Sequence, residues 1–386
     1  MFKTGSPVKG QAFIDRKKHL PIFKLYLQNN QHVTIKAPRR FGKTSLVKHV
    51  FEYEKSFEHI YIDIRRATTL RSLANQIIDK AYNFVGIDNF LIRFKSSITS
   101  LLKNIQSVKI DTIGEITLRH LESEVNEVEF FLHALDVVDE IAKNKEINIK
   151  FVFDEFQDIY KVSDKMILEQ MRSVMQHHEH ITYIFLGSIE SMMTEIFEDK
   201  RSSFFHFSRI MKLSGLDVDE LYDYADDFFT SLNISHDKSL KQLLIFLQGH
   251  PDYSMQILQA FYYRIIIDKV DNIDMKLCIE TLSQVLAENK AYLEELISQA
   301  KTKKHHFEVL SALANNTTVE LTSRTLYNTH ISLENHGLVK NTGRGLYELT
   351  DIFLKIFLQI EDVDDLQLLE RVTGLDFGEH HIPSCC

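Results

Sequence analysis

A segment near the amino terminus has the residue types and spacing of a phosphate-binding loop. In such loops consecutive backbone N–H groups point at a phosphate, and the positive end of the following helix points at the same group. Gly42 would allow close backbone approach, Lys43 would contact the β- and γ-phosphate oxygens, and the Thr44 hydroxyl would bind Mg²⁺. With the residue that follows it, the segment is Ala37-Pro38-Arg39-Arg40-Phe41-Gly42-Lys43-Thr44-Ser45, alanine replacing the usual first glycine.

A second candidate site is a hydrophobic run, residues 149–153, that ends in Asp154 and Glu155. Ligands of parallel sheets bind at the carboxyl ends of strands, where Asp154 would hold the water shell of Mg²⁺. Glu155 could then polarise an attacking water as a general base. Taken alone, an Asp-Glu pair is as typical of a solvated strand end as of a catalytic site. The phosphate-binding loop upstream makes the catalytic interpretation the stronger one, and the two segments together predict hydrolysis of a nucleoside triphosphate.

Other polar residues are expected near the γ-phosphate. Ser188 follows an apolar strand and Gly187, so it would lie beside Asp154 and could hydrogen-bond the γ-phosphate or its attacking water. Arg209 stands before a short strand and could reach a γ-phosphate of the same or a neighbouring subunit; an ion pair at the sheet edge explains it equally well. Arg201 is the alternative for this role.

Arg39 and Arg40 add positive charge inside the loop. They could contact the nucleotide, or they could form salt bridges with neighbouring carboxylates that hold the loop. We favour the salt bridges, because side chains in the middle of such loops often point away from the phosphate.

The elements that must position these residues form an α/β pattern. Short apolar strands alternate with helices, and parallel strands need long crossovers that are usually helical. This predicts a P-loop NTPase parallel sheet with helices on both faces. The expected strands are residues 32–36, 59–64, 147–153, 182–186 and 210–213. The expected helices begin at Lys43 and cover 70–85, 90–105, 127–143 and 163–177, the last capped by Ser163.

The pattern becomes almost wholly helical from Val218 onward, which predicts an all-α lid domain followed by a winged helix-turn-helix. A Gly343-Arg344-Gly345 turn would join the two strands of the wing. The lid helices are expected at 219–232, 238–247, 253–267 and 274–300, and the winged helix at 307–314, 321–327, 331–336, 338–341 and 346–349. The predicted domains are an ATPase core at 1–215, the lid at 216–300, the winged helix at 301–362 and a tail at 363–386.

Composition is that of an ordinary globular protein. Of 386 residues, 44% are hydrophobic and 26% charged, which argues against a disordered or fibrous chain. No apolar run approaches the roughly 20 residues that cross a bilayer, and the first residues lack a signal peptide. We therefore expect a cytoplasmic protein without membrane contact. The three cysteines, Cys278, Cys385 and Cys386, fit a reducing compartment.

These motifs resemble the AAA+ class of P-loop ATPases, and within it the archaeal-type ATPase family related to signal-transducing NTPases and origin-recognition initiators. The resemblance covers residues from about 10 to 360. Its landmarks are Phe13-Ile14-Asp15-Arg16, Arg39-Arg40-Phe41-Gly42-Lys43-Thr44-Ser45-Leu46, Asp154-Glu155-Phe156-Gln157, Gly187-Ser188, Gly249-His250-Pro251 and Tyr347-Glu348-Leu349-Thr350-Asp351.

The resemblance implies ATP as the nucleotide, with Mg²⁺. It places Asp15 and Arg16 in a segment that packs on the adenine, and Pro251 in a lid motif that approaches the base. This sequence departs from the pattern at Ala37. It also lacks an arginine soon after Pro251 that could act as a second sensor, because Arg264 comes late.

The winged helix is the expected contact with a partner, either DNA or protein. Its basic and amide residues are few for a protein of net charge −9, and Glu334 lies among them, so a protein-contact or lid-locking role is favoured. The candidates are Lys303, Lys304, Arg324, Asn328, His330, Asn335 and Arg344.

Two functions follow from these patterns. The first is Mg²⁺-dependent ATP hydrolysis coupled to conformational change of the lid and winged helix. The second is a nucleotide-gated regulatory or DNA-binding switch in which hydrolysis is slow or incidental. The sequence leaves open the pathway, the regulated partner, whether the chain forms a homo-oligomer, and the purpose of the inserted helices at about 86–146.

Overall fold

The computed structural model describes Phe2, Thr4 and residues 13–14, 16–85, 126–360 and 362–375. Asp15, the expected helix at 90–105 and the carboxy-terminal cysteines lie outside these residues. The chain divides into two compact units. We call Lys18–Ala37 with Val50–Leu213 the sheet unit. Met1–Lys17, Pro38–His49 and Ser214–Cys386 together form the lid unit.

The sheet unit is built on five parallel strands, as the alternating pattern predicted. β1, β3 and β4 are buried along their whole length, which is usual for strands covered on both faces. The order across the sheet is β2-β3-β4-β1-β5. The strands are β1 (Val33–Lys36), β2 (His59–Asp63), β3 (Ile149–Asp154), β4 (Ile181–Gly187) and β5 (Arg209–Lys212).

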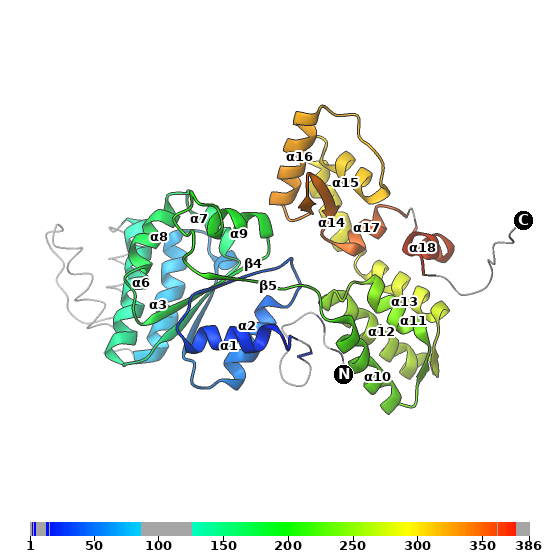
Figure 1. Cartoon of the computed structure of the whole chain (residues 1–386), viewed down its shortest axis with the longest axis horizontal. Coiled ribbons are helices and arrows are strands. Elements are labelled where there is room, and N and C mark those ends of the chain that lie inside the picture. The colour runs from blue at the N-terminus through cyan, green and yellow to red at the C-terminus, as the bar shows by residue number, and fades with distance from the viewer. Residues whose placement is uncertain are drawn as a thin grey trace, which may run out of the picture. The chain divides into compact units, whose positions relative to one another are not determined.

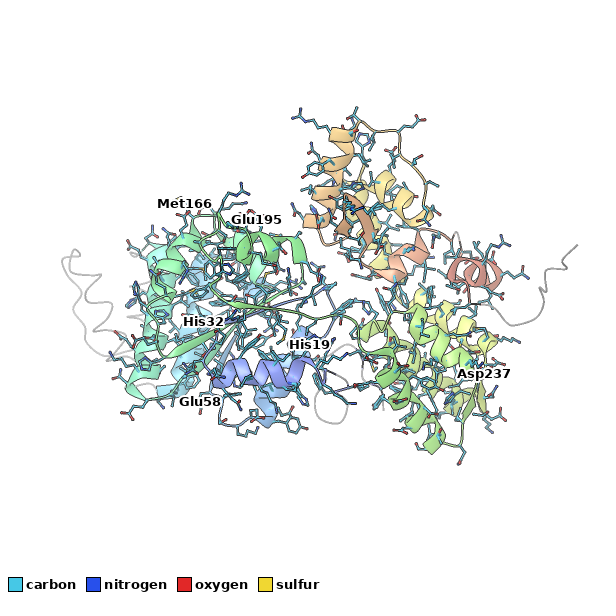
Figure 2. The ribbon with its side chains drawn as sticks, viewed as in Figure 1. His19, His32, Glu58, Met166, Glu195 and Asp237 are labelled. Atoms are coloured by element: carbon cyan, nitrogen blue, oxygen red, sulfur yellow. The ribbon has the colours of Figure 1, made fainter. Side chains whose placement is uncertain are left out.

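The register aligns the carboxyl ends of these strands at one edge of the sheet. Asp63 lies opposite Asp154, and Lys36 lies opposite both Gly187 and Lys212. In Figure 2 the side chains of Met166 and Glu195 lie at the end of the sheet unit opposite to Glu58, which immediately precedes β2. The candidate residues that follow β1, β3 and β4 therefore leave the sheet at the same edge.

Helices cover both faces of this sheet. α3, α6 and α8 pack side by side on one face, and α1 lies on the other (Figure 1). Phe151, Phe153, Tyr183 and Phe185 alternate along β3 and β4 and form the aromatic core beneath the three helices. The helices are α1 (His19–Gln28), α3 (Leu70–Val85), α6 (Glu127–Asn144), α7 (Ile159–Val162), α8 (Ile167–Met175) and α9 (Glu190–Phe197).

The helix predicted at 163–177 is present as α8, but it covers only Ile167–Met175, and its predicted cap at Ser163 is wrong. Ser163 has an extended backbone and ends α7 instead of starting a helix. The Asp164 carboxylate accepts a hydrogen bond from the backbone N–H of Met166 at 2.9 Å, which forms the turn that leads into α8.

The lid unit contains a cluster of helices that pack against one another (Figure 1). Aspartates at the positions before α10, α11 and α13 accept hydrogen bonds from the first backbone N–H groups, an arrangement that satisfies donors with no partner inside the helix. The helices are α10 (Val218–Ser231), α11 (Lys238–Phe246), α12 (Pro251–Asp268), α13 (Met275–Glu288) and α14 (Lys290–Lys301). Two short strands, β6 (Ser235–His236) and β7 (Asn272–Ile273), pair in parallel beside them.

The winged helix-turn-helix follows, with its hairpin turning at Gly343, Arg344 and Gly345, all at positive φ. The predicted helices at 321–327 and 331–336 are one continuous helix, which Thr322 caps at its start. Conversely, the predicted helix at 274–300 is two helices that meet at Asn289, whose side chain bonds Val285 and Gln256. The elements are α15 (His306–Asn315), α16 (Ser323–Asn335), β8 (Val339–Gly343), β9 (Leu346–Leu349), α17 (Ile352–Phe357) and α18 (Leu366–Thr373). No helix within the described ranges is long and apolar enough to cross a membrane.

His32 lies directly before β1, and its partly buried imidazole makes the stability of the sheet unit depend on pH. Its Nδ1 accepts a hydrogen bond from the Tyr183 backbone N–H at 3.1 Å, and its ring lies 4.7 Å from that of Phe207. Burial, together with the nearby charges of Arg172, His178 and Lys150, lowers the pKa of His32 to about 4.

The folded protein therefore resists protonation of His32 more than the unfolded chain does. We expect the free energy of unfolding to fall by up to about 3 kcal/mol as pH drops from about 6.5 to 4, at roughly 1.4 kcal/mol per pKa unit. His32→Gln should flatten this dependence in denaturant titrations at several pH values, whereas replacement of the exposed His177 by Gln should leave it unchanged. A wild-type slope retained by His32→Gln would contradict the assignment.

Candidate active site

The loop between β1 and α2 (Lys43–Tyr53) begins at the carboxyl edge of the sheet. Ala37 is fully buried there, and its backbone N–H donates to the carbonyl oxygen of Gly187. Gly42 has a φ of 82°, in the left-handed region that favours glycine. The Lys43 side chain is buried, and its Nζ donates to the carbonyl oxygen of Pro38 at 3.0 Å. The ammonium group thus bonds back to the start of its own loop.

Arg16 joins the segment before β1 to this loop. Its side chain is only 3% exposed, and one guanidinium nitrogen donates to the carbonyl oxygen of Phe41 while another donates to that of Ser214, each at 2.8 Å. Nearby, the Phe13 ring stacks on His49 at 4.0 Å. The contact with the adenine that the resemblance implies for Arg16 stays a prediction; these contacts make the residue a clamp on the loop.

The middle of the loop contacts the helices of the lid. Arg40 forms an ion pair with Asp252 at 3.3 Å and lies 4.3 Å over the ring of Tyr292. Phe41 meets His250 edge to face at 4.8 Å. The salt bridge favoured for the paired arginines is therefore present at Arg40. Pro251 is the first residue of α12, directly after the capping residue His250.

Asp154 ends β3 and is oriented by two hydrogen bonds. One carboxylate oxygen accepts from the hydroxyl of Tyr61, a β2 residue, and the other accepts from the backbone N–H of Glu155 at 3.0 Å. The side chain is largely buried. A carboxylate held in this way presents its remaining lone pairs in a fixed direction.

Glu155 has a left-handed backbone, with φ 54° and ψ 49°, which is uncommon outside glycine. Its Oε2 accepts from the Ser188 hydroxyl at 2.5 Å and from the Gln157 amide at 2.6 Å, while its Oε1 pairs with Arg65 at 3.2 Å. Ser188 thus lies against Glu155, whereas the sequence placed it beside Asp154. Both carboxylate oxygens of the candidate base are engaged by donors.

The sequence analysis missed Arg65. It lies in a single 3-10 turn, η2 (Ile64–Arg66), directly after β2, and it also donates to Asp158 at 3.3 Å. Burial disfavours its charge, but Glu155, Asp158 and Asp63 outweigh burial and raise the pKa of Arg65. The sequence does show two arginines, Arg65 and Arg66, directly after a predicted strand. It does not show that this strand pairs with β3, which is what brings Arg65 to Glu155.

The candidate arginines for the γ-phosphate do not join this cluster. Arg209 is the first residue of β5 and lies opposite Val33. It is therefore about 10 Å along the strand from the carboxyl edge, at about 3.3 Å per residue. A role toward a neighbouring subunit stays a prediction. Arg201 is exposed and pairs with Asp199 at 2.8 Å.

The donor set suits a hard cation that is shared with phosphate. Among the described residues, no three His, Cys, Asp or Glu side chains gather in a metal-binding group. Mg²⁺ usually binds one or two protein oxygens and keeps waters and substrate phosphates as its other ligands. The Thr44 hydroxyl in the lid unit and the oriented Asp154 carboxylate in the sheet unit are each oxygen donors of this kind.

Comparisons with known proteins identify a family and a shared fold. The model of a family described as an ATPase domain predominantly from Archaea matches residues 13–257. A Walker-type ATPase of Pyrococcus abyssi is similar in structure with a TM-score of 0.64 at 15% sequence identity, covering 93% of this chain and 99% of that one. At such low identity the likeness shows a shared fold.

Two further solved structures are more distant. The ORC2 protein of Aeropyrum pernix, with ADPNP and ADP, has a TM-score of 0.48 and 12% identity, over 95% of this chain and 96% of that one. The ORC1 protein of the same organism, in complex with DNA, has a TM-score of 0.48 and 11% identity, over 95% and 94%. A search of curated proteins gives no significant match.

The clamp formed by Arg16 is testable by replacement with methionine, which has a similar length and no donor. The change leaves the Phe41 and Ser214 carbonyl oxygens without their charged partner. We expect a loss of about 2–4 kcal/mol in the free energy of unfolding, measured by urea titration. The matched control is Lys17→Met, because the neighbouring Lys17 is 78% exposed. Equal effects of the two changes would show that Arg16 is not a clamp.

Proposed function

This chain belongs to the family of ATPase domains found predominantly in Archaea and is an ATP-hydrolysing enzyme; from this premise we propose that hydrolysis requires Mg²⁺ and uses Glu155 as general base. The observation that carries the proposal is the cluster on Glu155. Its carboxylate lies with Ser188, Gln157 and Arg65 at the carboxyl edge of the sheet, the edge at which β1 passes into the phosphate-binding loop.

The loop residues would bind the phosphates. Positive partial charge comes from the backbone N–H groups that start at Arg39 and from the amino end of α2. Lys43, whose Nζ donates to the carbonyl oxygen of Pro38, would exchange this carbonyl for the β- and γ-phosphate oxygens. Thr44 and Ser45 occupy the first turn of α2, from which their hydroxyls would contribute to binding the same ligand.

Thr44 and Asp154 would hold the magnesium ion, whose positive charge would offset the negative charge of the phosphates. The protein's own part is orientation. The Tyr61 hydroxyl and the Glu155 backbone N–H fix the Asp154 carboxylate, as outer partners commonly do for metal ligands.

Glu155 would take the proton of the attacking water. Beside it, the side-chain amide oxygen Oε1 of Gln157 is buried and has no hydrogen-bond partner among the described residues, so it could accept a hydrogen bond from the second O–H of that water. Ser188 would then donate to the γ-phosphate or to Glu155. ATP is preferred over GTP by family resemblance, and no Asn-Lys-x-Asp element occurs in the sequence.

The same contacts support the second candidate function, a nucleotide-gated switch with slow hydrolysis. Donors that bond a carboxylate favour its charged form and weaken it as a base. With Arg65, Gln157 and Ser188 all on Glu155, basal turnover should be slow until one donor leaves. A partner that binds the winged helix, protein or duplex DNA, would then act by stimulating turnover, and the exposed Arg324, Asn328 and Arg344 are its candidate contacts.

Substitution of Glu155 tests the general base. Glu155→Gln keeps the shape but cannot accept a proton, so we expect ATP binding to persist while hydrolysis falls about 10²–10⁴-fold in single-turnover assays. Lys43→Ala should instead weaken ATP binding by about tenfold or more, because a charged hydrogen bond is lost. The exposed Glu195→Gln in α9 is the control. Unchanged phosphate release by Glu155→Gln would remove the assigned base.

Arg65→Met tests whether the held base limits turnover. Freed from its ion pair, Glu155 should become more basic, and the basal rate of ATP hydrolysis should rise several-fold at unchanged ATP affinity. The control is Arg66→Met, whose neighbouring guanidinium is 81% exposed. A fall in rate for Arg65→Met would show that Arg65 positions the base for catalysis, and would count against the slow switch.

A further inference from the structure

Arg40 occupies a strained position in the phosphate-binding loop. Its φ of 64° lies in the left-handed region, where a residue with a Cβ atom is disfavoured by roughly 1–2 kcal/mol. Glycine adopts this conformation without that cost. Strained residues persist where surrounding contacts hold them in place, so the contacts of the Arg40 side chain indicate its use.

Those contacts lead from the loop to two lid helices. Arg40 pairs with Asp252, in the first turn of α12, at 3.3 Å, and it covers the ring of Tyr292 in α14 at 4.3 Å. The side chain is 36% exposed, and that of Asp252 is 19% exposed. A partly covered ion pair combined with a cation–π contact is worth more than a surface pair alone.

The chain of contacts continues from α12 to α17 of the winged helix. Phe41 packs on His250, which stacks on Tyr253 at 4.2 Å, and Tyr253 stacks on Phe353 at 3.7 Å. The Tyr253 hydroxyl donates to Asp351 at 2.7 Å. Asp351 in turn caps α17 by accepting from the backbone N–H groups of residues 353 and 354.

The charges in this chain depend on Arg40. Burial raises the pKa of both Asp252 and Asp351, and the positive charge of Arg40 opposes the rise at each of them. Gln256 adds a hydrogen bond to Asp252 at 2.8 Å. If the Arg40 guanidinium moved away, both of these partly buried carboxylates would lose stabilisation together.

We propose that Arg40 is a positioning residue that links phosphate binding in the loop to the order of α12 and α17. The inference rests on the proposed function in one respect, that the loop binds a nucleotide. Phosphates bound by the backbone N–H groups of the loop would shift the backbone at Arg40 and strain its ion pair with Asp252, so nucleotide binding loosens the contacts that run to Asp351. By thermodynamic linkage, a partner that alters α17 alters nucleotide affinity equally.

Hydrogen–deuterium exchange of the full-length chain, with and without ADP and Mg²⁺, tests the link. In the wild type we expect amides of residues 250–256 and 350–357 to exchange about threefold faster with ADP bound. Arg40→Gly suits the test, because glycine keeps the left-handed backbone and relieves strain, so the variant should fold. At an ADP concentration that saturates the variant, as its own binding titration establishes, we expect no ADP-dependent change at 350–357.

Two further variants complete the design. Asp252→Asn removes the other end of the ion pair and should abolish the same response. Arg39→Gly is the matched control, since Arg39 is an exposed neighbour in the same loop, and it should retain the response.

The outcomes distinguish a failure of the role given to Arg40 from a failure of nucleotide binding by the loop. An ADP response at 350–357 that survives Arg40→Gly overturns the role of Arg40, as does a wild-type protein that binds ADP without any response there. Failure of the wild type to bind ADP with Mg²⁺ overturns the proposed function as well. Loss of the response in Arg40→Gly and Asp252→Asn, with binding retained, supports the link.

Discussion

The parallel register of the sheet brings the ends of β2, β3, β4 and β1 to one edge, and the chemistry of the protein depends on that alignment. It sets Asp63 opposite Asp154 and Gly187 opposite Lys36, so the residues after each strand emerge together. Because β1 lies between β4 and β5, the phosphate-binding loop starts beside the strand that supplies Ser188. A change in strand order would separate these groups without altering any motif.

Three residues around the candidate site, Arg16, Arg40 and Glu155, have positive φ although none is glycine. Each such residue costs about 1–2 kcal/mol, and each is held by side-chain contacts that glycine could not make. Arg16 clamps two carbonyl oxygens, Arg40 reaches the lid helices, and Glu155 accepts from three donors. The backbone strain thus accompanies side chains that are held by several contacts.

Much of this arrangement follows from local patterns. The strand ending at Lys36, the helix starting at Lys43 and the buried strand before Asp154 depend on short-range periodicity and on a spaced motif, so they could be predicted. Arg65 and Tyr61 could not be assigned, because they reach Glu155 and Asp154 only through the pairing of β2 with β3, about 90 residues apart. The break at Asn289 was likewise set by a contact with Gln256 on another helix.

The central claim is that the loop ending at Thr44 and the carboxylate of Asp154 act on one magnesium-bound triphosphate. A crystal structure of the full-length protein with a non-hydrolysable ATP analogue and Mn²⁺ in place of Mg²⁺, located by anomalous scattering, tests it directly. We expect the metal within about 2.0–2.5 Å of the Thr44 hydroxyl and bonded to Asp154 directly or through one water. A triphosphate bound elsewhere, or a metal with no link to Asp154, would contradict the claim.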